Sequence, residues 1–309
     1  MRTRRLGATG LQVSIVGLGC NNFGMRCDYE ASKAVVHRAL DLGVTFFDTA
    51  DIYGDRQSEV HLGRALGARR ADIVLATKFG IPTGESPLDR GASRRYIFRA
   101  LDASLERLGT DYIDLYQLHF PDPETPIEET LRALDDVVRA GKVRYIGCSN
   151  LSAWQLVEAQ WTSRDLGLAS FATAQNYYNL LERGIESELV PAAVQYGVGI
   201  LPYFPLASGF LTGKYKRGVA APPDTRLGSG TAFGAELSDE NFDRIEKLAS
   251  FASERGHNLL ELAIGWLASR PYVSSVIAGA TRPEQVEQNI KAAEWQLEAN
   301  EFAAVDAVA

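Results

Sequence analysis

The 309-residue sequence has little of what secreted, membrane-spanning or nucleic-acid-binding proteins require. Its three cysteines, Cys20, Cys27 and Cys148, are too few and too odd in number for a disulfide framework. No apolar run approaches the roughly 20 residues that cross a bilayer, and the basic N-terminus is not followed by the apolar core of a signal peptide. A net charge of −7 argues against a basic surface for nucleic acid. We therefore expect a cytoplasmic globular protein that binds neither nucleic acid nor membrane.

One local pattern recurs along the chain: an amphipathic helical segment ends at a glycine, and a short β-branched or aromatic run follows. Gly43, Gly109, Gly141 and Gly197 mark the clearest examples. Glycine suits the left-handed position after a helix because it has no Cβ atom to clash with the backbone. Strands that alternate with helices indicate a parallel sheet, and no Pro/Ser-rich linker interrupts the pattern. We therefore expect a single domain over residues 1–309.

The number of expected strands indicates the architecture. They lie near residues 13–18, 44–48, 73–77, 112–118, 143–147, 171–175, 198–202 and 273–277. Eight strands alternating with eight helices are typical of a (β/α)8 TIM barrel, and we expect a short N-terminal segment to cap its bottom. The alternative, a doubly wound sheet, needs a G-x-G-x-x-G fingerprint after its first strand, and Asn22 stands where the third glycine belongs. Residues 203–239, rich in Gly, Pro and Ser, form a long loop of the kind that is usually functional.

Polar side chains occur at the ends of neighbouring expected strands, where barrel enzymes carry their chemistry. Asp48, Lys78 and His119 end three of them, and Tyr53 follows Asp48 closely. Taken singly, each has an ordinary explanation: a structural ion pair of Asp48 with Lys78, a packed tyrosine, and a hydrogen-bonded histidine. Their occurrence together on adjacent strand ends favours one active site.

The motifs around these residues resemble the aldo-keto reductase family. They are Phe47-Asp48-Thr49-Ala50 with Tyr53-Gly54 and Glu59, Thr77-Lys78, Leu118-His119, Gly147-Cys148-Ser149-Asn150, Gln175-Asn176-Tyr177, Pro205-Leu206-Ala207 with Leu211-Thr212-Gly213-Lys214-Tyr215, and Gly279-Ala280-Thr281-Arg282. The resemblance covers nearly the whole chain in order. It implies a barrel enzyme that reduces the carbonyl group of a small molecule with NADPH and without a metal ion.

The resemblance assigns the catalytic roles to four residues. Tyr53 would give a proton to the carbonyl oxygen, although a free phenol, with a pKa near 10, is a reluctant acid at neutral pH. The Lys78 ammonium would lower the pKa of Tyr53, and Asp48 would keep that lysine charged and oriented. His119 would donate a hydrogen bond to the substrate oxygen or assist the proton transfer.

The resemblance also assigns contacts to the cofactor, NADPH or NADP+. Residues after the fifth and sixth expected strands match positions that bind the nicotinamide carboxamide, and an aromatic residue ends the seventh beneath the ring. The long loop supplies contacts over the pyrophosphate, and the last barrel helix begins near the adenosine, with Arg282 placed for the 2′-phosphate. In chain order the set is Gly19, Ser149, Asn150, Gln175, Tyr203, Leu206, Lys214, Arg226, Gly279, Thr281, Arg282, Gln285 and Asn289.

Some positions depart from the family pattern. Phe204 replaces a common serine before the loop proline, and the stretch 19–22 lacks the Trp or Met of many relatives. Only 20 residues follow Asn289, which implies an open site with loose substrate preference. Four aromatic residues are expected to form apolar pocket walls: Phe23, Phe79, Phe120 and Tyr178.

Two other functions remain open. The family includes potassium-channel β subunits, so the chain can be interpreted as a cofactor-binding regulatory subunit. A barrel lyase or isomerase would instead use Lys78 as a Schiff-base amine, although Asp48 favours a charged lysine. The sequence distinguishes neither one carbonyl substrate from another nor a monomer from a homo-oligomer.

Overall fold

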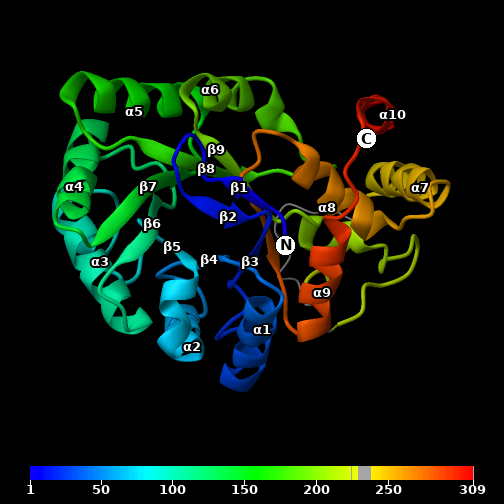
Figure 1. Cartoon of the computed structure of the whole chain (residues 1–309), viewed down its shortest axis with the longest axis horizontal. Helices are drawn as coiled ribbons and strands as arrows, with labels where there is room; N and C mark the ends of the chain where they lie inside the picture. Colours follow the sequence, from blue (N-terminus) through cyan, green and yellow to red (C-terminus); the bar gives the residue numbers. More distant parts are fainter. Residues whose placement is uncertain (224, 229–237, 309) are drawn as a thin grey trace.

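The centre of the computed structural model, which describes residues 1–223, 225–228 and 238–308, is a sheet of eight parallel strands. Neighbouring strands follow the order β10-β3-β4-β5-β6-β7-β8-β9 (Figure 1). The two end strands approach each other where Ile200 hydrogen-bonds Tyr272 and Ser274 through the backbone, over 2.8 and 2.9 Å. The sheet is therefore a nearly closed barrel, and the expected fold class is confirmed.

All eight expected strands are present, with ends that differ from the expectation by at most three residues. They are β3 (Val16–Gly19), β4 (Phe46–Asp48), β5 (Val74–Phe79), β6 (Ile113–Leu118), β7 (Val143–Ser149), β8 (Phe171–Tyr177), β9 (Gly199–Tyr203) and β10 (Val276–Gly279).

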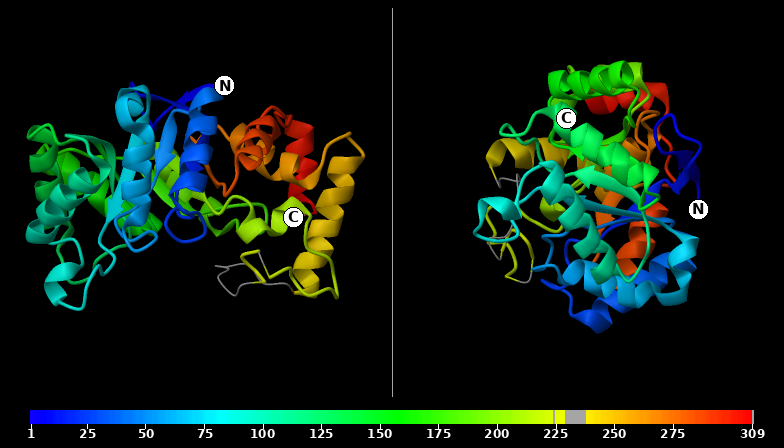
Figure 2. Two further views of the ribbon diagram at one scale, coloured as in Figure 1. Left: turned by 90° about the horizontal axis from the view of Figure 1, so that it is seen from below. Right: turned by 90° about the vertical axis from the view of Figure 1, so that its left-hand side faces the viewer.

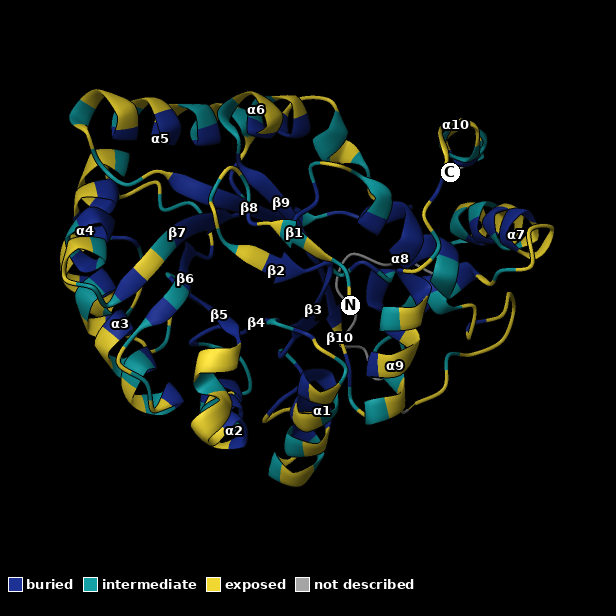
Figure 3. Cartoon of the chain, in the orientation of Figure 1, coloured by how far each residue is buried: buried dark blue, intermediate teal, exposed yellow. Residues whose placement is uncertain are grey.

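Helices surround this barrel, and their outer faces are exposed while most of each barrel strand is buried (Figure 3). They are α1 (Tyr29–Asp41), α2 (Gln57–Leu66), α3 (Arg94–Leu108), α4 (Ile127–Arg139), α5 (Ala153–Leu166), α6 (Leu189–Tyr196), α7 (Asp239–Ser253), α8 (Leu259–Ser269), α9 (Pro283–Ala292) and α10 (Ala299–Asp306). Gly43, Gly109, Gly141 and Gly197 all have positive φ angles after a helix, as the sequence pattern predicts. No helix of the described residues is long and apolar enough to cross a membrane.

The hydrophobic core has two parts. The larger part lies between the barrel and its helices. The smaller part fills the barrel itself and consists of Leu6, Val13, Phe46, Val74, Ala76, Leu115, Leu201 and Ile277. The barrel is therefore packed, and room for a ligand is found above it, at the carboxyl ends of the strands.

An antiparallel hairpin of β1 (Thr3–Arg5) and β2 (Gln12–Ser14) closes the opposite end of the barrel. Leu6 and Val13 of this segment are fully buried, and the Arg4 guanidinium donates hydrogen bonds to the carbonyl oxygens of Arg270 and Val273. Figure 2 shows the hairpin and the segment after β9 at opposite ends of the molecule. The expected N-terminal cap is confirmed.

The long loop after β9 is partly built into the structure. It contains the 3-10 helix η4 (Ala207–Thr212), and Phe210 packs edge-to-face on Phe242 of α7 with ring centroids 5.0 Å apart. Residue 224 and residues 229–237 lie outside the described residues, so the expectation that 203–239 covers the cofactor stays a prediction.

A close backbone approach under the barrel makes Gly199 a sensitive position. An added Cβ atom there would overlap Ser274 Oγ and lie 2.7 Å from the Gly7 nitrogen. We expect Gly199→Ala to lower the free energy of unfolding by about 1–3 kcal/mol, as overpacking does. Urea denaturation checks this, with Gly10→Ala as the control because nothing lies within 4 Å of its Cβ position. Equal stability of the two variants would contradict the packing argument.

Candidate active site

Four polar side chains meet at the carboxyl rim of the barrel. Asp48 ends β4, Lys78 lies near the end of β5, His119 follows β6, and Tyr53 lies in the loop after β4. The Lys78 ammonium donates to Asp48 Oδ2 over 2.5 Å and lies 3.4 Å from the Tyr53 hydroxyl oxygen. The rings of Tyr53 and His119 pack edge-to-face with centroids 5.7 Å apart. The four residues that the sequence places on adjacent strands thus form one contiguous group.

Asp48 is held from several strands at once. Its Oδ1 accepts hydrogen bonds from Gln117 Nε2 of β6 over 3.0 Å and from Gln175 Nε2 of β8 over 2.9 Å. Its Oδ2 accepts from Lys78, whose ammonium also donates to the Thr49 carbonyl oxygen over 2.8 Å. Because both ions are buried and their hydrogen bonds are shared among fixed groups, the pair has one well-defined geometry.

The same contacts determine which groups carry charge. Burial alone favours the neutral amine of Lys78, but the Asp48 carboxylate and the Tyr53 hydroxyl favour the ammonium, and its pKa lies above the usual value. Burial raises the pKa of Tyr53, and the Lys78 charge only partly opposes this. Lys78 lowers the pKa of Tyr53 as expected, but burial has the larger effect, so the net shift is upward. Tyr53 keeps its proton at neutral pH.

His119 is neutral in this site. Burial and the nearby Lys78 charge both push its pKa well below the usual value. Its Nδ1 atom is buried and has no hydrogen-bond partner among the described residues. A strongly shifted pKa in a histidine that lines a cavity is typical of a functional site.

Residues of the first motif hold the Tyr53 loop in place. Ser58 Oγ lies 2.8 Å from Thr49 Oγ1 and donates to the Cys20 carbonyl oxygen over 2.8 Å. Glu59, fully buried on α2, accepts from Thr77 Oγ1 over 2.6 Å and is paired with Arg107 of α3. These bonds fix the loop against β5 and α3.

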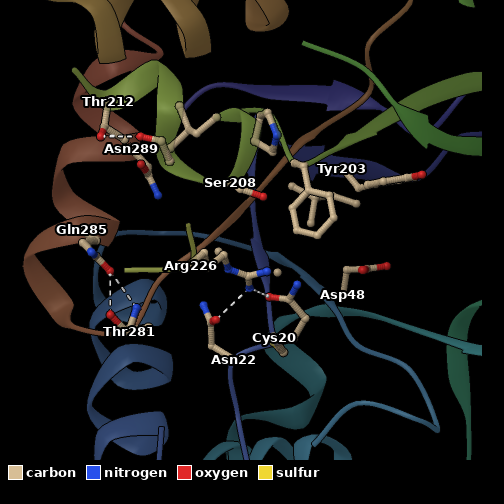
Figure 4. A pocket seen from close by; sticks show the side chains of 18 of the residues that line it. Cys20, Asn22, Asp48, Tyr203, Ser208, Thr212, Arg226, Thr281, Gln285 and Asn289 are labelled. Carbon is tan, nitrogen blue, oxygen red and sulfur yellow. Dashed lines mark hydrogen bonds between the residues drawn. The ribbon is translucent and has the colours of Figure 1, made fainter. Parts of the chain in front are cut away.

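A cavity of about 900 Å³ opens above the four residues, near the upper end of the usual range for ligand pockets (Figure 4). Asp48, Tyr53 and His119 line one end of it, and Lys78 lies behind Tyr53. Every residue that the resemblance assigns to the cofactor also lines it: Gly19, Ser149, Asn150, Gln175, Tyr203, Leu206, Lys214, Arg226, Gly279, Thr281, Arg282, Gln285 and Asn289.

The inner part of the cavity is built from neutral hydrogen-bonding groups. Asn150, with a positive φ of 62°, donates from Nδ2 to the His119 carbonyl oxygen over 3.0 Å and accepts from the Tyr203 hydroxyl over 2.8 Å. Ser149 Oγ donates to the carbonyl oxygen of Gln175 over 2.8 Å. The Tyr203 ring stacks on Tyr177 with centroids 5.6 Å apart. This network positions the polar groups and the aromatic ring beside Tyr53 and His119.

The remainder of the cavity is cationic. Arg26, Lys214, Arg226, Arg282 and Lys291 line it. Among the residues that the structure describes, its acidic lining consists of Asp48, already paired with Lys78, and Glu261. Arg282 is the N-cap residue of α9, so a helix N-terminus adds to the positive potential there. The lining therefore suits a ligand with several negative charges.

Arg226 is held in place by other residues that line the cavity. Its Nη2 atom donates to Asn21 Oδ1 over 3.0 Å and to Asn22 Oδ1 over 2.8 Å, and the guanidinium lies 5.3 Å from the centroid of the Phe204 ring (Figure 4). Phe204, which replaces the common serine, therefore provides a surface for this arginine.

The family model named Aldo/keto reductase family matches residues 15–309. The chain belongs to the aldo/keto reductase family. It is 41% identical over 300 residues to the "Probable voltage-gated potassium channel subunit beta" of Oryza sativa subsp. japonica, covering 94% of this chain and 91% of that protein. It is 39% identical over 304 residues to the "Uncharacterized oxidoreductase YrpG" of Bacillus subtilis, covering 95% and 91%. It is 35% identical over 305 residues to the "L-glyceraldehyde 3-phosphate reductase" of Escherichia coli K12, covering 94% and 87%.

In this aldo/keto reductase, three of the four aromatic residues expected to form the pocket walls lie elsewhere. Phe23, Phe79 and Tyr178 are fully buried in the core and do not line the cavity; Phe120 does, with 46% of its surface exposed. Phe79 stacks on Tyr116 at 4.7 Å between ring centroids, and the Tyr178 hydroxyl donates to Glu186. An aromatic residue at a strand end can point into the core or into the pocket, and the sequence pattern does not distinguish the two.

Other lining residues were not expected from the sequence. Asn258, Leu260 and Glu261 reach the cavity from the start of α8, and Gln117 holds Asp48 from β6. The Asn258-Leu259-Leu260-Glu261 segment forms a capping box, which is a signal for a helix start but not for a binding site. A contact of this kind depends on how α8 packs on the barrel.

The buried Asp48–Lys78 pair predicts a large effect on stability. Asp48→Asn leaves the Lys78 charge enclosed without a counter-ion, and we expect the free energy of unfolding to fall by about 3 kcal/mol or more. Urea denaturation at pH 7 measures it. Asp41→Asn is the control because Asp41 pairs with Arg69 at the surface, where about 0–1 kcal/mol is expected. Similar losses for the two variants would show that the buried pair contributes no more to the free energy of unfolding than a surface pair does.

Proposed function

We propose that this family member reduces the carbonyl group of a small aldehyde or ketone to an alcohol with NADPH, and that Tyr53 is the proton donor. The observation that carries the proposal is the group of Tyr53, Lys78, Asp48 and His119 at one end of a cavity whose remaining lining is cationic. The family places the chain among oxidoreductases, and the names of some relatives are those of reductases.

The volume and the cationic lining of the cavity support NADPH as the cofactor. Ser149, Asn150 and Gln175 would hold the carboxamide of the nicotinamide, with the Tyr203 ring beneath it. Lys214 and Arg282 would hold the phosphates, because arginine and lysine side chains are the usual phosphate ligands. When bound, the nicotinamide supplies the hydride that reduces the carbonyl carbon.

The protein supplies the proton. The raised pKa of Tyr53 keeps its hydroxyl protonated until a substrate arrives. As the proton moves to the substrate oxygen, negative charge develops on the phenol oxygen, 3.4 Å from the Lys78 ammonium. Lys78 therefore stabilises the negative charge that develops on the Tyr53 oxygen during the reaction, and Asp48 keeps the lysine charged and in place.

His119 is suited to orienting the substrate. A neutral imidazole can donate a hydrogen bond to the carbonyl oxygen without introducing a charge that competes with Tyr53 for the developing negative charge. Its ring lies against Tyr53, so an oxygen bound by one group is within reach of the other.

A regulatory role is the second candidate. The relatives from Oryza sativa and Arabidopsis thaliana that are named as potassium-channel β subunits favour it. Trp154 and Trp161 on α5, with exposed fractions of 66% and 55%, provide an apolar surface where a partner would dock. The complete catalytic group favours the reductase. An assay that monitors aldehyde turnover by the loss of NADPH absorbance discriminates between the two: turnover supports the reductase, and its absence supports the regulatory role.

Lys78 is poorly suited to the Schiff-base alternative. That chemistry needs a neutral amine, whereas Asp48 and Tyr53 hold the pKa of Lys78 above its usual value. Borohydride trapping of a carbonyl compound on Lys78 would reverse this conclusion.

Removing the phenol proton tests the catalytic role. Tyr53→Phe keeps the ring and deletes the hydroxyl, so we expect kcat to fall by about 10²–10⁴-fold while the Kd for NADPH stays near that of the unmodified enzyme. Steady-state kinetics and fluorescence titration measure the two quantities. Retention of more than about a tenth of kcat would rule out the general-acid role.

Cofactor preference tests the role of Arg282. The 2′-phosphate of NADPH needs a cation, and Arg282→Ala should raise the KM for NADPH by about ten- to a hundredfold, the range of a charge-assisted hydrogen bond, with little change for NADH. Arg38→Ala removes an arginine that pairs with Glu287 of α9 outside the cavity, and serves as the control. Equal increases for NADPH and NADH would assign Arg282 to the fold instead.

A further inference from the structure

A second buried acid lies next to the catalytic tyrosine. Asp51 is in the loop after β4, two residues before Tyr53, and only 2% of its surface is exposed. Neither carboxyl oxygen has a hydrogen-bond partner among the described residues. The backbone N–H of Asp51 donates to the Lys78 carbonyl oxygen over 3.2 Å, which fixes the main chain of the loop against β5. A buried carboxyl group without partners is rare, so this one needs an explanation.

The cations that face Asp51 are each bound by another group. Arg107 of α3 bonds Glu59 of α2 over 2.7 Å, and the Lys78 ammonium of β5 bonds Asp48 over 2.5 Å. Arg56, in the same loop, is exposed, and its guanidinium donates to the carbonyl oxygen of Thr83. Asp51 therefore has no cation of its own.

The other titratable groups that interact with Asp51 are acidic or phenolic. Glu59 is fully buried, and its carboxylate raises the pKa of Asp51, whereas the Arg107 guanidinium, which is bonded to Glu59, opposes this. Tyr116 of β6 is fully buried with an unpartnered hydroxyl, and Tyr96 of α3 lies within electrostatic range. These surroundings penalise a negative charge on Asp51. Burial and the Glu59 carboxylate, opposed by Arg107, Lys78 and Arg56, raise the pKa of Asp51 to about 7.

We propose that Asp51 is a positioning residue for proton transfer, a buried carboxyl group whose charge state controls how readily Tyr53 releases its proton. The proposal rests on the proposed reductase function. A negative Asp51 raises the pKa of Tyr53 and so acts against Lys78, which lowers it. With Asp51 protonated, this one opposing charge is absent and Tyr53 is the stronger acid, although burial and Asp48 still raise its pKa.

The sign of the pH effect follows from this arrangement. Below about pH 7 Asp51 is neutral, and reduction, which needs an acid, is favoured. Above that pH the Asp51 charge makes Tyr53 a weaker acid and its phenolate a stronger base. Reduction should therefore slow and alcohol oxidation should accelerate as the pH rises through this range.

The decisive experiment observes Tyr53 without any reaction. The full-length protein is labelled with ¹³C at the Cζ atom of tyrosine, and the Tyr53 resonance is assigned by its absence in Tyr53→Phe. We expect this resonance to shift between pH 6 and pH 8 in the unmodified protein and in Asp55→Asn, which removes an exposed carboxylate from the same loop. In Asp51→Asn, whose amide cannot ionise, the shift should disappear.

Two results would overturn the proposal: a Tyr53 resonance that does not move between pH 6 and pH 8, or a movement that persists in Asp51→Asn. The first result is decisive even where Asp51→Asn does not fold, since it needs only the unmodified protein and Tyr53→Phe.

Kinetics then connect the titration with catalysis. Between pH 6 and pH 8.5 we expect kcat for reduction to fall about three- to tenfold in the unmodified enzyme and in Asp55→Asn, the size expected for a like charge that weakens a general acid. The profile of Asp51→Asn should be flat. Identical profiles for Asp51→Asn and the unmodified enzyme would reject the role of Asp51. An unmodified enzyme that turns over no carbonyl would reject the reductase function instead, and the resonance of Tyr53 would still decide the coupling.

Discussion

The arrangement of the active site depends on the buried ion pair between Asp48 and Lys78. A carboxylate and an ammonium removed from water are tolerated only where their geometry is good and their remaining hydrogen-bonding capacity is used. Here Gln117 and Gln175 satisfy one oxygen of Asp48, and the Thr49 carbonyl oxygen accepts from the lysine. These bonds connect β4, β5, β6 and β8 at the rim. The position of Tyr53 then follows, because its hydroxyl oxygen lies beside the same ammonium.

Two carboxyl groups three residues apart in sequence have opposite environments. Asp48 has a cation and two amide donors, whereas Asp51 has no hydrogen-bond partner among the described residues and faces a second acid, Glu59. One acid, at the end of β4, is thus paired with a cation, whereas the other, in the loop that follows, has its pKa raised to about 7. Enzymes commonly separate the protonation states of neighbouring acids in this way, through burial and partners rather than through residue type.

Much of the fold could be predicted from the sequence because it depends on local patterns. The glycines after helices require positive φ angles, and the β-branched runs between them form the strands. The location of the site could also be predicted, since strand ends of a barrel converge. The side-chain directions could not: Phe79 and Phe120 follow similar patterns, yet one is in the core and the other in the cavity. The pKa of Tyr53 could not be predicted either. It depends on the balance between burial, which raises it, and the Lys78 charge, which lowers it, and the extent of burial is a property of the folded structure.

The near-closure of the barrel has a mechanical consequence. Seven neighbouring strand pairs form hydrogen-bonded ladders, whereas β9 and β10 meet through the backbone around Ile200 and Val273. This junction ends at the cavity, which Tyr203 at the end of β9 and Gly279 at the end of β10 both line. A ligand that contacts both residues connects β9 to β10, so its binding stabilises the barrel at the junction outside these seven ladders.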